Sequence, residues 1–141
     1  MAHTGHPAID EAPQVVAEWV NLLCEDLEWD EKRRGYLLLH ETLHAIRDFL
    51  TVDEAADLAA QLPLIIRGIY YTGWNPSATP IKPRSKTAFL DRVSRHFDKI
   101  PLEDPERAVA AVFDLLRRKV SFSELQQVSH AMRGPLQDLW T

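Results

Sequence analysis

Apolar residues recur at spacings of three and four along most of this chain, which is the period of an amphipathic α-helix. The alternation of apolar and polar residues that marks a half-buried strand does not occur. The spacing predicts a first helix over 15–28 and a longer second helix after it. One apolar stripe runs down that second helix and consists of Tyr36, Leu39, Leu43, Ile46 and Leu50.

The same pattern occurs a second time. Sliding the chain by 70 residues lays 16–71 over 86–141 without a gap, and apolar positions fall on apolar positions. The matched apolar pairs include Trp19/Phe89, Leu43/Phe113 and Tyr70/Trp140. The identical pairs are Arg47/Arg117 and Glu54/Glu124. Because packing conserves a core more than a surface, we predict an all-α protein of two quasi-repeated units, each of about four helices.

Residues that start helices occur at corresponding places in both units. Asp30 is expected to cap the second helix of the first unit, and Asp104 followed by Pro105 that of the second unit. The stripe of the second unit is expected at Val109, Val112, Phe113, Leu116 and Val120, packed against the first stripe. Capping boxes for the third helices are expected at Thr51-Val52-Asp53-Glu54 and Ser121-Phe122-Ser123-Glu124.

The two units predict one domain over 15–141. It comprises a repeat over 15–71, a connector over 72–85 and a repeat over 86–141, with a loose leader over 1–14 before it. The connector holds three prolines among turn residues, so we expect an ordered segment that is not a helix. A chain of 141 residues is long enough to bury one shared core.

Composition and charge exclude several classes of protein. The net charge of −5 argues against a general nucleic-acid binder, because neutralising phosphates requires a basic face. Apolar runs are far too short to cross a bilayer. The single cysteine, Cys24, cannot form an internal disulfide, which favours a reduced, cytoplasmic setting.

Charge is distributed unevenly, and this suggests a binding surface. Between Ile81 and Lys99 there are six basic residues and two acidic ones. Such a stretch is usually a solvated face whose charge is offset by acids elsewhere, with Tyr70 in the core and Trp74 fixing the connector. The alternative is a surface for a protein partner or an anionic ligand, with Tyr71, Trp74, Lys82, Arg84 and Lys86 as its candidate residues.

The segment His40-Glu41-Thr42-Leu43-His44 has the spacing of a helical zinc site, in which two histidines bind the metal and a glutamate activates water. This spacing makes a zinc-dependent hydrolase the alternative function, with His40 and His44 as ligands and Glu41 as the base. The third ligand that such a site needs is not evident, because His96 and His130 fall in the other unit. In the second unit, the residues that correspond to His40, Glu41 and His44 are Ala110, Ala111 and Asp114.

Three segments resemble a bacterial family known as domain of unknown function 2267. They are 54–63 (EAADLAAQLP), 68–76 (GIYYTGWNP), and Arg84-Ser85 leading into Phe89-Leu90 and Val93. The resemblance extends over nearly everything after residue 14 and implies an all-helical protein of two related halves. It assigns no catalytic residues and no cofactor.

Taken together, the residues favour a soluble, non-enzymatic interaction or regulatory module without a cofactor. A zinc hydrolase is the alternative in a different class. A third possibility is a helical homo-oligomer that uses its remaining apolar surface as its own interface.

Overall fold

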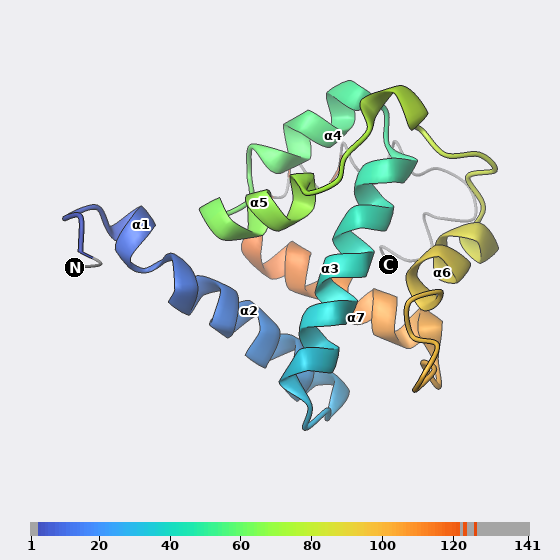
Figure 1. The fold of residues 1–141 in the computed structure, drawn as a ribbon, viewed down its shortest axis with the longest axis horizontal. Helices are drawn as coiled ribbons and strands as arrows, with labels where there is room; N and C mark the ends of the chain where they lie inside the picture. The colour runs from blue at the N-terminus through green and yellow to red at the C-terminus, as the bar shows by residue number, and fades with distance from the viewer. Residues whose placement is uncertain (1–2, 122, 124–125, 127–141) are drawn as a thin grey trace.

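The computed structural model describes residues 3–121, 123 and 126, and every regular element in that part of the chain is a helix (Figure 1). The all-α prediction is therefore confirmed. The elements are α1 (Pro7–Asp10), α2 (Ala12–Leu27), α3 (Lys32–Phe49), α4 (Val52–Ala59), α5 (Leu64–Tyr71), the 3-10 turn η1 (Pro76–Ala78), α6 (Lys86–Ser94) and α7 (Pro105–Lys119). None of the helices in this part of the chain has the length and apolar character needed to span a bilayer.

Helix α3 lies at the centre of the fold. It packs against α2, α5, α6 and α7, while α4 and α5 cover its C-terminal end (Figure 1). Four members of its predicted stripe are fully buried, namely Leu39, Leu43, Ile46 and Leu50. The prediction for the fifth member, Tyr36, was wrong, since this residue is 41% exposed. Leu38, two residues later, is fully buried instead.

Helix α7 has the stripe that the sequence predicts. Val109, Val112, Phe113 and Leu116 are fully buried, and α7 packs on α3 as expected. The packing is also reciprocal between the predicted units, because α2 contacts both α3 and α7 while α6 contacts both α7 and α3. This is the arrangement that two related halves would adopt, and the relation between the halves stays a prediction.

The helix starts follow the predicted capping signals at two of three described places. The Asp104 carboxylate accepts a hydrogen bond from the Arg107 amide at 3.1 Å, with Pro105 in the first turn. Thr51 and Glu54 form a reciprocal capping box at the start of α4. The second predicted capping box includes residues outside the described part of the chain.

The prediction that Asp30 starts α3 was wrong. The residue before the helix is Glu31, whose backbone is extended and whose side chain makes no capping hydrogen bond. Asp30 lies one residue too early for its carboxylate to reach the free amides of the first turn. Helix α2 begins at Ala12, before the expected residue 15, because Pro13 is tolerated in a first helical turn.

Close approach of α2 and α3 depends on Gly35. A Cβ atom at this position would lie 2.3 Å from the Sγ atom of Cys24, which is itself buried. This distance is far below van der Waals contact, so any side chain here would push the two helices apart.

The connector is attached to the core at both ends. The Ile81 amide donates to the Asp48 carbonyl at 2.8 Å, which fixes the connector beside the C-terminal end of α3. Trp74 is half-buried, packs on the core and contacts the ring of Tyr71. Just before the connector, Tyr70 is fully buried and its hydroxyl donates to the Ala55 carbonyl at 2.9 Å.

Candidate functional sites

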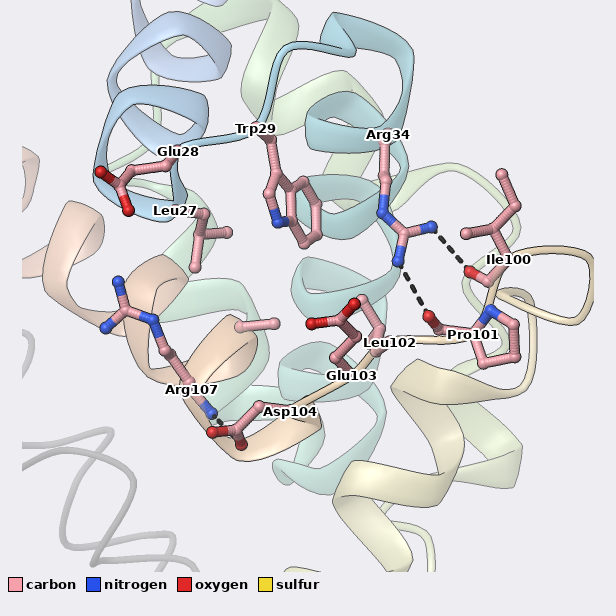
Figure 2. Close-up of a pocket in the computed structure, with 11 residues that line it drawn as sticks. Leu27, Glu28, Trp29, Arg34, Ile100, Pro101, Leu102, Glu103, Asp104 and Arg107 are labelled. Carbon is pink, nitrogen blue, oxygen red and sulfur yellow. Dashed lines mark hydrogen bonds between the residues drawn. The ribbon is translucent and has the colours of Figure 1, made fainter.

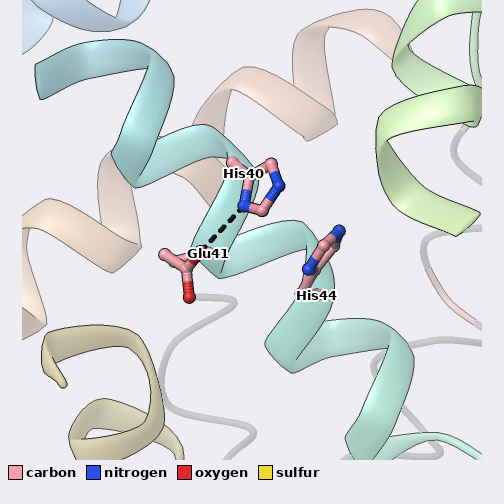
Figure 3. A group of neighbouring side chains, drawn as sticks. All are labelled: His40, Glu41 and His44. Atoms are coloured by element: carbon pink, nitrogen blue, oxygen red, sulfur yellow. Dashed lines mark hydrogen bonds and ion pairs between the residues drawn. The ribbon is translucent and has the colours of Figure 1, made fainter. Parts of the chain in front are cut away.

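Three side chains of the predicted zinc motif lie together on α3 (Figure 3). The rings of His40 and His44 are neighbours, with centroids 4.1 Å apart. His40 Nδ1 lies 2.7 Å from Glu41 Oε2. One possible ligand atom from each of the three residues lies within 4.8 Å of the other two. The helical spacing places His40 and His44 one turn apart on the same side of α3, as expected, and the Glu41 side chain reaches His40 from the adjacent position.

His44 is held by the neighbouring helix α5. Its Nε2 atom lies 2.7 Å from the carbonyl oxygen of Ile69, which can only accept, so Nε2 carries the proton and Nδ1 has a free lone pair. Burial lowers the pKa of the His44 imidazole. The ring is therefore neutral near pH 7, which is the state that binds metal ions.

His96, which the sequence analysis set aside because it falls in the second unit, lies beside this group. It follows α6, and its Nδ1 atom lies 2.6 Å from Glu41 Oε1. The sequence places it in the second unit, and nothing in the spacing indicates that the turn after α6 faces this part of α3. The one available signal is that His96 belongs to the basic stretch between Ile81 and Lys99.

Glu41 is consequently enclosed by imidazoles. One carboxylate oxygen faces His40 and the other faces His96, and the side chain is only 7% exposed. A general base must have an oxygen within hydrogen-bond reach of an attacking water. With both oxygens already paired, this geometry suits a metal ligand or a structural acceptor better than the catalytic base of a hydrolase.

A second polar group lies at the C-terminal end of α3. The Asp48 carboxylate accepts from Arg47 Nε at 2.7 Å and from an Arg92 Nη atom at 2.8 Å. Arg47 also donates to the carbonyls of Tyr70 and Thr72 at 3.0 and 2.9 Å. Burial alone raises the pKa of the Asp48 carboxyl, but the hydrogen bonds and charges of the two arginines outweigh it, so the pKa lies below its ordinary value.

A groove lies beside this group, between α6 and the connector. Its volume is about 470 Å³, and we call it the α6 groove; it is lined by Phe49, Ile81, Ala88, Asp91, Arg92 and Arg95. The Nε atom of Arg92 is buried and has no hydrogen-bond partner among the described residues. A buried donor without an acceptor is costly, and this donor has no accessible surface, so it is the exposed Arg95 that offers the groove a freely accessible guanidinium.

The predicted connector surface is only partly available. Lys86 forms an ion pair with Glu106, and Arg84 also has a partner. Lys82 is exposed and directly follows Ile81 of the α6 groove. Trp74 contacts Tyr71 and packs on the core, so much of its ring is covered.

Another cavity, of about 450 Å³, lies between the loop before α3 and the loop before α7 (Figure 2). Arg34, in the first turn of α3, donates to the carbonyls of Ile100 and Pro101 at 2.7 and 3.1 Å. Its guanidinium also lies 4.8 Å from the ring centroid of Trp29. Because Arg34 already binds the protein itself, this cavity has one cationic group fewer to offer a ligand.

The chain matches no curated protein. A family model described as an uncharacterized conserved protein, DUF2267, matches residues 16–139. This match begins inside α2 and covers α3 to α7, which include both polar groups of α3, the connector and the α6 groove. It agrees with the resemblance seen in the segments around Gly68–Pro76, and the chain therefore belongs to the DUF2267 family.

Proposed function

We propose that this protein is a non-enzymatic interaction module that binds an acidic segment of a protein partner in the α6 groove. The observation that carries this proposal is an apolar floor next to two arginines, Arg92 and Arg95. An extended acidic segment offers both an apolar side chain for the floor and a carboxylate for the arginines.

The charges around the groove support an anionic partner. Arg92 lines the groove, and its hydrogen bond to Asp48 holds the guanidinium in place. Arg95, the residue that follows α6, is exposed, and Lys82 directly follows Ile81 of the floor. Asp91 is the one acid among the described residues of the lining, which leaves these residues positive overall.

The floor of the groove supports a peptide over a simple inorganic ion. It is formed by Phe49 from the end of α3, Ile81 from the connector and Ala88 from α6. An inorganic anion would gain nothing from these apolar atoms, whereas a leucine, isoleucine or phenylalanine side chain would bury its surface against them.

A random peptide library panned against the full chain tests the proposal. We expect enrichment of sequences in which Asp or Glu lies next to Leu, Ile or Phe, with binding that weakens as salt is raised. The best peptide is then measured by fluorescence anisotropy against Arg95→Gln. A charge-assisted hydrogen bond contributes about 1.5–3 kcal/mol, so we expect about 10-fold weaker binding or more.

The matched control is Arg33→Gln, which removes the same charge from an exposed position at the start of α3, outside the groove lining. It should leave peptide binding unchanged, while Ile81→Ser should weaken it. Selected peptides without acidic residues, or equal loss in the Arg33 and Arg95 variants, would contradict the proposal.

A further inference from the structure

The group formed by His40, Glu41 and His44 is not used by the α6 groove and can be judged independently of it. Two imidazoles and one carboxylate are a common protein ligand set for zinc. We propose that these three side chains bind one divalent transition-metal ion of the zinc class, with Glu41 acting as a ligand and not as a catalytic base.

The first support is that two of these side chains, His44 and Glu41, already have the outer partners that metal ligands require. A ligating histidine usually donates its other ring N–H to a carbonyl, and a ligating carboxylate usually accepts a further hydrogen bond. His44 donates from Nε2 to the Ile69 carbonyl, which leaves Nδ1 for a metal ion. Glu41 faces His96 with Oε1, which leaves Oε2 for the metal ion.

The second support is proximity. The ring centroids of His40 and His44 are 4.1 Å apart, and one possible ligand atom from each of the three side chains lies within 4.8 Å of the other two. One ion could therefore contact all three side chains.

The distances require only a small adjustment. Ligand atoms about 2.0–2.1 Å from a tetrahedral ion lie about 3.4 Å from one another, so atoms now within 4.8 Å would have to approach by up to about 1.4 Å. The side chain of His40 is 28% exposed and has room to rotate. Its present hydrogen bond to Glu41 would be replaced by two bonds to the same ion.

The proposed site would connect three parts of the fold. Its ligands come from α3, while Ile69 on α5 and His96 after α6 orient them. Three protein ligands leave a fourth position for water or an external ligand. An ion bound here would therefore stabilise the packing of α5 and α6 against the middle of α3.

Titration of the full chain, produced without a histidine tag and freed of metal by a chelator, tests the site. We expect one Zn²⁺ per chain by calorimetry, and Co²⁺ should give the visible absorption bands of tetrahedral coordination. His40→Ala and His44→Ala should each weaken binding by about 100-fold or more, and His96→Gln by about 10–100-fold with the stoichiometry kept.

Two controls make the result decisive. Replacing both His3 and His6 by Gln removes exposed histidines near the start of the chain and should not change Zn²⁺ binding. If His44→Ala does not fold by circular dichroism, His44→Gln replaces it, because its amide can still donate to Ile69. Absence of stoichiometric Zn²⁺ binding, or undiminished binding in the folded His40 and His44 variants, would overturn the site.

The outcome is separable from the proposed interaction function. Arg95→Gln should bind Zn²⁺ like the wild type, since Arg95 belongs to the α6 groove and not to the proposed ligand set. Loss of Zn²⁺ binding in that variant would contradict the placement of the metal site at His40, Glu41 and His44.

Discussion

Helices α3 and α7 occupy corresponding positions in the predicted repeat, yet they bury different kinds of side chain. The seven buried residues of α7 are all apolar, whereas α3 buries Glu41, Thr42, His44, Arg47 and Asp48 among its apolar residues. The corresponding residues of α7 are Ala111, Val112, Asp114, Arg117 and Arg118, and the polar ones among them are not buried. The burial of polar side chains therefore distinguishes α3 from its counterpart.

The two polar groups on α3 also differ from each other. At the C-terminal end, Arg47 and Asp48 satisfy each other and tie down the end of α5. In the middle, His44 keeps one free nitrogen after its bond to Ile69. The hydrogen bonds of Arg47 and Asp48 to each other and to the backbone stabilise the fold. The free ring nitrogen of His44 can still bind a ligand.

Of the substitutions proposed here, Asp48→Ala should destabilise the protein most. Asp48→Ala leaves Arg47 and Arg92 buried without their shared carboxylate, and loss of one partner from a buried ion pair costs about 3–5 kcal/mol. The matched control is Arg118→Ala at the corresponding position of α7, which removes an exposed pair with Asp114 and should cost about 0.5 kcal/mol. Urea unfolding measures both, and similar losses in the two variants would show that α3 and α7 do not differ as described.

Gly35→Ala should have the next largest effect. In an ordinary helix this change stabilises, but here the new methyl group meets Cys24 Sγ, and overpacking costs about 1–3 kcal/mol. The double variant with Cys24→Ala makes room for the methyl group and should recover most of the loss in thermal unfolding. A Gly35→Ala protein as stable as the wild type would mean that α2 and α3 can separate at little cost.

A smaller effect tests whether the halves are related. Thr51→Ala removes the cap that follows α3, and we expect a loss of about 1 kcal/mol in denaturant unfolding. Ser121 is the corresponding residue after α7, and the repeat predicts a similar loss for Ser121→Ala. An unchanged stability in the Ser121 variant would count against the predicted second capping box.

The smallest expected effect is a change in pH dependence. Because the pKa of Asp48 is lower in the folded protein than its ordinary value, the folded state gains stability from this carboxylate above that value. The gain is lost as the pH falls through the lowered pKa. Asp48→Asn should therefore show a shallower loss of stability between pH 5 and pH 2, about the range in which an aspartate titrates. Parallel curves for the two proteins would assign the acid sensitivity to other groups.

The sequence predicts the fold well where local patterns decide it. Helical periodicity identified the stripes of α3 and α7, and residue chemistry identified the caps at Thr51 and Asp104. Tyr36 was wrongly assigned to the buried stripe, because residues near the start of a helix can face solvent even when they fit its apolar spacing. Its counterpart in the second unit, Glu106, already indicates a solvent-facing position.

The sites are harder to predict because they depend on distant contacts. His40, Glu41 and His44 share one helix, so their spacing alone brought them together. His96 reaches Glu41 only because α6 packs on α3, and the α6 groove exists only because the connector returns to Asp48. No local pattern contains these contacts.

Arg34 has a consequence for how this protein can vary. It joins the first turn of α3 to the main-chain oxygens of residues 100–101, so the side chains at 100–101 can change without loss of the two bonds. Arg34 itself has no equivalent substitute, because the single ammonium of lysine cannot reproduce the planar fork that meets two carbonyls at once. Substitutions are therefore tolerated at residues 100–101 and restricted at Arg34.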